Sequence, residues 1–309
     1  MRILTIFNLI VLLLFTSDRE KIPVGGQAVI EGVLMKGPHG WALAVREPSC
    51  KIWTHSWPES TWLKRGIWQL PIIRGFATMV EMMRIGMKAL SMSAEISLGE
   101  EDNISNLEMF LSVAFAISAV ILLFIALPMF LSEYITAYFT LSHLSKNILE
   151  GVFRGIVFVS YILVISLWKD MRRVFEYHGA EHKTINAYES NAEMNPVDIQ
   201  RYSRIHRRCG TSFLLIVIFV SIIVFSSISF LSISMKILSR VILLPLIIGI
   251  SYEFIKYAAN SNGLGAICMK PALLLQYITT KEPSEDQIEI ALTALNLALV
   301  TNKNKEENI

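Results

Sequence analysis

Four long apolar runs constrain the fold of this chain more than any other feature of its sequence. They cover residues 107–132, 148–168, 212–234 and 237–257, and each has about the 20 apolar residues that cross a bilayer as a helix. Of the whole chain, 53% is hydrophobic and 17% is charged, whereas an average soluble domain is about 25% charged. A soluble protein with four buried core helices is the alternative, and four such runs argue against it. The sequence therefore predicts a membrane α-helical protein with four transmembrane helices.

Basic residues are unevenly distributed among the segments that join these runs. Ten Lys or Arg lie in residues 17–106 and eight lie in 169–211, whereas 133–147 carries only Lys146. Cytoplasmic segments of membrane proteins are enriched in Lys and Arg, so we expect both basic segments, and both ends of the chain, on the cytoplasmic side. The segment at 1–21 has a hydrophobic stretch of thirteen residues, and a cleaved signal peptide, an uncleaved anchor and a short hydrophobic N-terminal extension are the three readings of it.

The segments outside the apolar runs have their own patterns. Short apolar stretches separated by turn signals predict an antiparallel meander in 22–58. Apolar residues at helical spacing in 62–98 predict an amphipathic helix, of the kind that lies on a membrane surface. Ser284 and Gln287 form a capping-box pattern before a helix that ends near residue 300. The expected organisation is a cytoplasmic α+β module in 22–106, a membrane domain in 107–257 with a helical cytoplasmic loop at 169–211, and a cytoplasmic tail with one helix in 258–309.

The chemistry of the chain is concentrated in the loop at 169–211, where His178, Glu181 and His182 form an H-x-x-E-H pattern. Residues four apart share one face of a helix, so the two imidazoles can reach one metal ion. This order is that of inverted zinc peptidases. There the metal lowers the pKa of its water and a Glu accepts the proton. The pattern predicts His178 and His182 as ligands of a divalent metal, zinc by its ligand types, with Glu181 as the general base.

Further residues near the ends of the apolar runs are candidates to complete such a site. His206 and Cys209 form an H-x-x-C pair in the same segment, and Glu253 lies near the cytoplasmic end of the fourth run. A site closed by four protein ligands is structural, whereas three ligands and an open position serve catalysis. The alternatives are a solvated helix carrying His178 and His182, a small buried Cys209, and a Glu253 that pairs with Lys256 or Arg240.

The remaining features exclude several classes of function. The net charge of +2 does not indicate a nucleic-acid partner, and we expect the basic residues at 201–208 to face anionic lipid headgroups. Three widely spaced cysteines do not form a disulfide framework. The expected partners are the lipid bilayer, a membrane or peptide partner, and a second copy of the chain, because four helices are few for an enclosed membrane cavity.

Five blocks of sequence resemble the signatures of the YqhQ-like family of multi-pass membrane proteins, found in bacteria and with relatives in plastids. The blocks are VGGQAVIEGV at 24–33, YHGAEHK at 177–183, HRRCGTSF at 206–213, Tyr252-Glu253, and QYITTKEP at 276–283. The resemblance covers about residues 22 to 300 and implies that the His178, Glu181, His182, His206 and Cys209 positions are family features. The family is described as predicted metal-dependent enzymes, with no reaction or substrate assigned. Arg207 departs from the proline expected at its position.

Three functions are consistent with these observations. The first is a metal-dependent hydrolase, or peptidase, at the cytoplasmic face of a bacterial cytoplasmic membrane or a plastid membrane. The second is a non-enzymatic membrane scaffold or assembly factor that holds partners with its cytoplasmic parts. The third is a transporter, which ranks last because the runs lack a charged centre and a broken helix pair.

Overall fold

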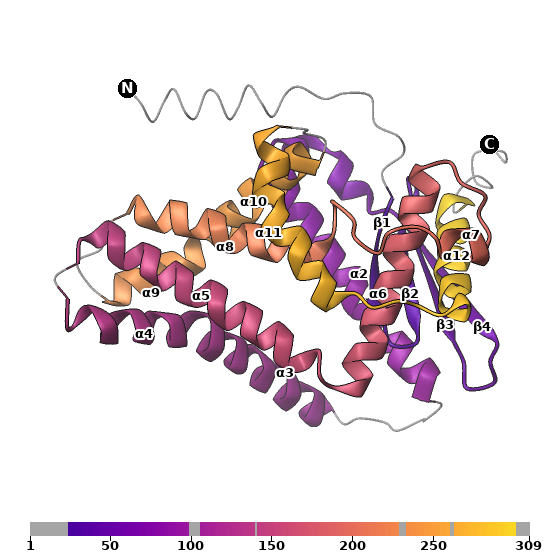
Figure 1. Cartoon of the computed structure of the whole chain (residues 1–309), viewed down its shortest axis with the longest axis horizontal. Coiled ribbons are helices and arrows are strands. Elements are labelled where there is room, and N and C mark those ends of the chain that lie inside the picture. Colours follow the sequence, from indigo (N-terminus) through magenta and orange to yellow (C-terminus); the bar gives the residue numbers. More distant parts are fainter. Residues whose placement is uncertain (1–23, 99–105, 140, 229–232, 260–262, 301–309) are drawn as a thin grey trace.

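The computed structural model describes residues 24–98, 106–139, 141–228, 233–259 and 263–300. The extension at 1–21 and the final residues from 301 lie outside the described residues. Figure 1 shows two parts, a layered part that contains a β-sheet and an elongated arm of helices beside it. Helices from both halves of the sequence contribute to each part, so the chain passes between the two parts several times.

The layered part is built on a four-stranded antiparallel sheet in the order β1-β2-β3-β4. The expected meander is therefore confirmed. The turn between the second and third strands is closed by a bond from Gly37 N to Gly40 O, as the Gly-Pro-His-Gly signal predicts. The strands are β1 Gly25–Val29, β2 Gly32–Lys36, β3 Gly40–Arg46 and β4 Ile52–Pro58.

Helices cover both faces of this sheet. One core joins the sheet to α6 (Lys169–Glu189) and α12 (Glu285–Val300), and a second core joins the other face to α2 (Ile73–Leu98). Strands β2 and β3 are almost wholly buried because neither face meets water. The predicted capping box at the start of α12 is confirmed, since Ser284 N donates to Gln287 Oε1 at 2.9 Å and Gln287 N to Ser284 Oγ at 3.3 Å.

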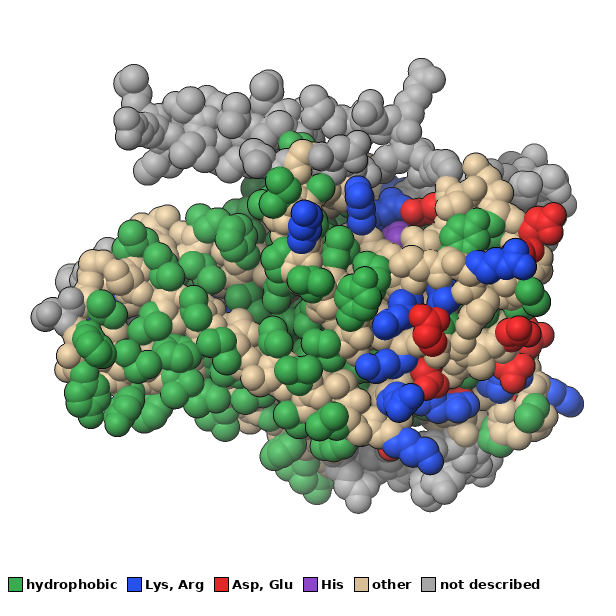
Figure 2. All heavy atoms as spheres, in the orientation of Figure 1, with side chains coloured by type: hydrophobic (Ala, Val, Ile, Leu, Met, Phe, Trp, Pro, Cys, Tyr) green, Lys and Arg blue, Asp and Glu red, His purple; other side chains and the backbone are tan. Residues whose placement is uncertain are grey.

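The arm is apolar and contains two helical spans long enough to cross a membrane by length and composition, Phe110–Thr136 and Leu144–Ile165. Figure 2 shows hydrophobic side chains spread over the arm, with basic side chains gathered where it meets the layered part. The arm comprises α3 Asn106–Ile121, the π-helical turn η3 Leu122–Ala126, α4 Leu127–Thr136, α5 His143–Ile165, α8 Gly210–Ser226, α9 Ile233–Ile242 and α10 Leu244–Ala259.

The other two predicted membrane helices are not confirmed as spans. The third run forms α8, which has 17 residues. The fourth run is divided at Leu243 into α9 and α10, next to Pro245, whose ring and missing N–H interrupt a helix. The structure thus supports a mostly helical chain with two spans of sufficient length among the described residues, and the other two predicted spans are not confirmed.

Two helical predictions outside the arm require correction. The tail has α11 (Leu264–Thr279) before α12, so the expectation of one tail helix is wrong. Helix α11 carries Pro271 inside it and packs against α8 and α10. The amphipathic helix begins at Ile73, because Gly66 and Pro71 confine the preceding residues to two short 3-10 turns, η1 Thr61–Lys64 and η2 Gly66–Gln69. A short helix α7, Pro196–Ile199, follows α6.

The packing of α5 on α8 generates a testable prediction from two glycines one turn apart. A Cβ at Gly151 would lie 2.1 Å from Ile222 Cγ1, whereas a Cβ at Gly155 would meet nothing within 4 Å. Gly151→Ala should lower the free energy of unfolding by about 1–3 kcal/mol through overpacking. Gly155→Ala should raise it by about 0.5–1 kcal/mol, since alanine favours a helix interior. Thermal unfolding in detergent micelles measures both, and equal effects would contradict the α5–α8 contact.

Candidate metal centre

Three candidate ligands lie together where the layered part meets the arm. His178 and His182 lie one turn apart on α6, with ring centroids 4.4 Å apart. Cys209 is the N-cap residue of α8. One ligand atom from each of the three lies within 4.8 Å of the others. The structure thus brings together one turn of α6 and the N-cap residue of the apolar helix α8.

Backbone carbonyls orient both imidazoles in the same way. His178 Nδ1 lies 2.8 Å from Thr279 O, and His182 Nδ1 lies 2.6 Å from Arg204 O. A carbonyl only accepts, so each Nδ1 carries a proton and each Nε2 is the ring nitrogen left to face the site. His178 Nε2 lies 3.2 Å from Cys209 Sγ, and His182 Nε2 is buried with no hydrogen-bond partner in the described part of the chain. Histidines that bind metals are held through their other ring nitrogen in this manner.

The electrostatics of the cluster favour an ionised thiol. Burial opposes the charge on Cys209, but His178 and His182 outweigh it and hold the pKa of the thiol well below its usual range. Burial likewise lowers the pKa of His178, whereas the negative charge and hydrogen bond of Cys209 prevail and raise it to about 9. A thiolate is the form of cysteine that binds metals. A cation bound by these residues would replace the proton that they share.

Glu181 lies on the same helix, on the side that faces the sheet. It is 4% exposed, and no hydrogen bond to its carboxylate occurs among the described residues. A Cβ at Gly26 of β1 would lie 2.9 Å from Glu181 Cγ, so only glycine leaves room for this side chain. Burial raises the pKa of Glu181, and the neighbouring His178 and His182 oppose that rise. The carboxylate is thus largely buried and free of hydrogen bonds among the described residues, as suits a general base.

His206 lies beside the three ligands, and its ring nitrogen is directed elsewhere. Its ring centroid is 5.7 Å from that of His182, while its Nε2 lies 3.4 Å from Glu189 Oε2. Glu189 also pairs with Arg208. Burial works against the charge on Glu189, but His206 and Arg208 lower its pKa overall. The structure therefore places His206 next to the ligands, with Glu189 as its partner.

Glu253 does not lie with the histidines. It is 2% exposed and is paired with Arg74, whose Nε donates to Glu253 Oε1 at 2.5 Å and whose Nη2 donates to Glu253 Oε2. This ion pair joins α10 to the start of α2, 179 residues earlier in the chain. The structure therefore gives Glu253 an ion pair with Arg74 in place of the predicted role as a metal ligand.

The segment at 276–283 supports the site, and the sequence patterns gave no role to its residues. Gln276 is fully buried, accepts from His206 N and donates to His206 O and Ser212 Oγ. Thr279 provides the carbonyl for His178. A Cβ at Gly179 would lie 2.0 Å from Lys281 O. Four of the family-like blocks therefore meet at this site, namely 24–33, 177–183, 206–213 and 276–283. Their resemblance to a known family is the sequence signal that could have identified the supporting residues.

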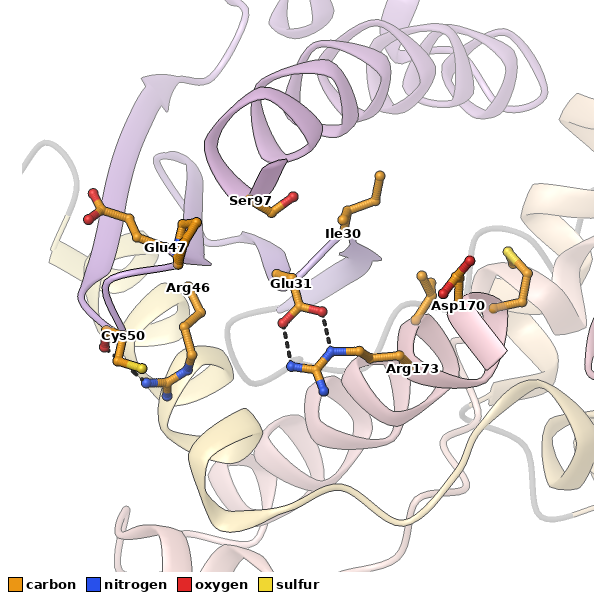
Figure 3. Close-up of a pocket in the computed structure, with 11 residues that line it drawn as sticks. Ile30, Glu31, Arg46, Glu47, Cys50, Ser97, Asp170 and Arg173 are labelled. Atoms are coloured by element: carbon orange, nitrogen blue, oxygen red, sulfur yellow. Dashed lines mark hydrogen bonds and ion pairs between the residues drawn. The ribbon is translucent and has the colours of Figure 1, made fainter. Parts of the chain in front are cut away.

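A separate pocket of about 720 Å³ lies between the start of α6 and two turns of the sheet. Figure 3 shows Glu31 and Arg173 facing each other across it as a doubly bonded ion pair, with Arg46 beside them. Glu31 also accepts from Tyr177 OH at 3.1 Å. Glu31 and Cys50 both have positive φ, 51° and 63°. The pocket thus lies close to Tyr177, the residue before His178 on α6. None of the three candidate ligands lines it.

Comparisons with known proteins identify the family of this chain. The model of the family described as "Protein of unknown function (DUF1385)" matches residues 70–301. The chain is 33% identical over 312 residues to "Uncharacterized protein YqhQ" of Bacillus subtilis (strain 168), which covers 94% of this chain and 97% of that protein. No solved structure gives a significant match.

Gln276 generates a prediction for the support of the site. Gln276→Leu leaves the buried backbone N–H and C=O of His206 without partners, and each such group costs about 1–3 kcal/mol. We expect a large drop in the melting temperature in detergent micelles. Gln69→Leu is the matched control, since Gln69 is exposed and bonds only to Lys64 O, and a surface change has an effect within about 0.5 kcal/mol. A stable Gln276→Leu protein would contradict this role.

Proposed function

The chain belongs to the DUF1385 family. We propose that it is a membrane-embedded protein holding one divalent metal ion, zinc by its ligands, for a hydrolytic reaction. His178, His182 and Cys209 hold the ion. The observation that carries the proposal is the buried His182 Nε2, which lacks a partner and belongs to a group of three ligand atoms within 4.8 Å of one another.

The residues present fit zinc in both type and number. Imidazole nitrogen and thiolate sulfur suit zinc, whereas magnesium and calcium require oxygen ligands. Each histidine is already held through Nδ1, so that its Nε2 faces the other ligands. Three protein ligands leave one position open, which is the arrangement of catalytic zinc sites. The pairing of His206 with Glu189 supports three ligands over a closed set of four.

In the proposed hydrolysis, Glu181 transfers the proton of the attacking water. When bound, a divalent metal ion supplies Lewis acidity and lowers the pKa of a water molecule. Glu181 follows His178 by three residues on α6 and has no hydrogen bond among the described residues. It accepts the proton from the attacking water and passes it to the leaving group. Gly26 of β1 packs against Glu181 and helps to bury it. This burial raises the pKa of Glu181 and so makes its carboxylate a stronger base.

A second candidate function, catalysis by Cys209 as a nucleophile, is supported by one distance. His178 Nε2 lies 3.2 Å from Cys209 Sγ, which is the contact of a cysteine nucleophile and its base. Cys209 also stands at the first turn of α8 and accepts from Thr211 N at 3.4 Å. Both histidines face Cys209, whereas a dyad uses only one of them, and for that reason we prefer the metal centre.

We further propose that the arm crosses the bilayer four times. The two long spans are followed by α8 and by the kinked pair α9 and α10, which together reverse the direction of the chain. Figure 2 supports this topology, because the apolar arm ends in a zone of Lys and Arg beside the layered part. Basic residues at that boundary support a cytoplasmic layered part, which would put the metal centre at the cytoplasmic face of the membrane.

Metal analysis tests the centre directly. Purified protein should contain about one zinc per chain, the content of a single site, and His182→Gln or Cys209→Ser should abolish it. His206→Gln and Glu253→Gln are the matched controls and should retain the metal. Inductively coupled plasma mass spectrometry gives the content, and circular dichroism checks the fold. Zinc-free, folded wild-type protein that loses Cys209 to iodoacetamide would support the thiol nucleophile instead.

Glu181→Gln separates the hydrolase from the scaffold. The variant should keep its metal and fold, because the amide has nearly the volume of the acid, and should lose a base worth roughly 10²–10⁴-fold in rate. A library of fluorogenic peptides and esters, screened with zinc-loaded protein, measures that loss. The scaffold is favoured if Glu181→Gln restores growth or viability in a deletion strain as well as the wild-type chain does.

Labelling of single cysteines tests the topology. Cys50 lies exposed in the layered part, and Tyr138, 70% exposed, follows α4. In intact cells an impermeant maleimide should modify Tyr138→Cys but not Cys50, and permeabilised cells should show both. Equal modification of the two positions in intact cells would exclude the proposed orientation.

A further inference from the structure

A buried charged cluster formed by Glu150, Arg154 and Arg240 lies in the arm, far from the metal centre. The side chains are 3%, 12% and 7% exposed. Glu150 and Arg154 lie on α5 one turn apart, and Arg240 lies on α9. Figure 1 places α9 and the beginning of α5 at the end of the arm that is remote from the sheet. Ionisable groups inside a membrane domain are costly, and they usually mark a functional site.

Both guanidinium groups bind the same carboxylate. Arg154 Nη2 donates to Glu150 Oε1 at 2.8 Å, and Arg240 Nη2 donates to Oε1 at 3.0 Å and to Oε2 at 3.1 Å. One carboxylate compensates one positive charge. The three side chains together thus carry a net charge of +1, in surroundings where an uncompensated charge costs several kcal/mol.

The other contacts of the two arginines are neutral. Arg154 Nε donates to Phe124 O in the π-helical turn η3 at 3.0 Å, and its Nη1 donates to Ser221 Oγ at 3.4 Å. The Arg240 guanidinium carbon lies 3.8 Å from the centroid of the Phe225 ring. Arg240 Nη1 is buried and has no hydrogen-bond partner among the described residues. Among the described residues, one positive charge of these three side chains therefore has no counter-charge, and the donor Arg240 Nη1 has no acceptor.

We propose that this cluster is a binding site for a phosphate-type anion, held by Arg240 Nη1 with the charge of Arg154 beside it. Guanidinium groups prefer oxyanions, to which they donate parallel hydrogen bonds. Glu150 lies seven residues into α5, so at 1.5 Å per residue it is about 10 Å from the helix start. In a bilayer with a core of about 30 Å that depth lies inside the hydrocarbon, in the half nearer the start of α5, from which long arginine side chains can reach toward the headgroups. The phosphate comes either from a phospholipid headgroup or from solution.

The alternative role is a clamp that fastens α9 to α5 without a ligand. The two roles differ in the effect of Glu150→Gln. In the anion site the carboxylate competes with the ligand, so its removal should strengthen phosphate binding by about tenfold or more, given the energy of close charges. In the clamp its removal only weakens the helix contact, and no phosphate dependence appears.

The experiment uses the full chain in nonionic detergent micelles with two probes, sodium phosphate against sodium chloride at equal ionic strength, and phosphatidylglycerol against phosphatidylcholine. Thermal shifts and native mass spectrometry report binding. Wild type should respond saturably to at least one probe, and Arg240→Gln should lose the response. Arg201→Gln is the matched control, since Arg201 is 75% exposed in the layered part and its loss changes the net charge equally.

The two probes identify the source of the anion. A response to phosphatidylglycerol alone assigns the site to a lipid headgroup, and a response to phosphate as well assigns it to the phosphate group itself. Arg240→Lys keeps the charge but removes the planar donors, so a folded protein with binding weakened by about tenfold supports the site even if Arg240→Gln unfolds. No saturable response in wild type, or an equal response in folded Arg240→Gln, would overturn the proposal. Zinc content should be the same in all these variants, because the cluster is separate from the metal centre.

Discussion

The hydrogen bonds from His178 and His182 to the carbonyls of Thr279 and Arg204 are the contacts on which the arrangement of this molecule depends. They join α6 of the layered part to the end of α11 and to the loop before α8. The same two bonds set the tautomer of each histidine and leave both Nε2 atoms directed into the site. The junction between the parts and the candidate metal centre are thus one structure, so a change that loosens the junction also disturbs the ligands.

The burial of polar groups explains why this junction needs so many specific contacts. Glu181, His182 and Lys183 are all less than a tenth exposed, and a buried charge is costly unless it is paired. Lys183 donates to Gln200 O at 2.7 Å and pairs with Glu282 at 2.9 Å. Glu181 and His182 Nε2 have no such partner among the described residues. We interpret this contrast as the mark of groups kept for a ligand, while their neighbours serve the fold.

The sequence predicted the sheet, the helix α12 and the apolar character of the arm, because each follows from a local pattern. Helix α11 was missed because Pro271 and Gly265 obscure its apolar stretch. The spacing of His178 and His182 indicated a shared face, and the H-x-x-C pair pointed to Cys209. The partners of His206 and Glu253 were beyond prediction, since Glu189 and Arg74 approach them only through tertiary packing. Spacing identifies residues that can bind a metal, whereas the fold decides which neighbour each one meets.

X-ray absorption at the zinc K-edge tests the central claim most directly. For purified protein we expect a first shell with one sulfur at about 2.3 Å and two imidazole nitrogens at about 2.0–2.1 Å, completed by a light atom from solvent. Cys209→Ser should remove the sulfur contribution. A shell without sulfur, a shell with three imidazoles, or protein that binds no zinc while it stays folded would contradict the metal centre of His178, His182 and Cys209.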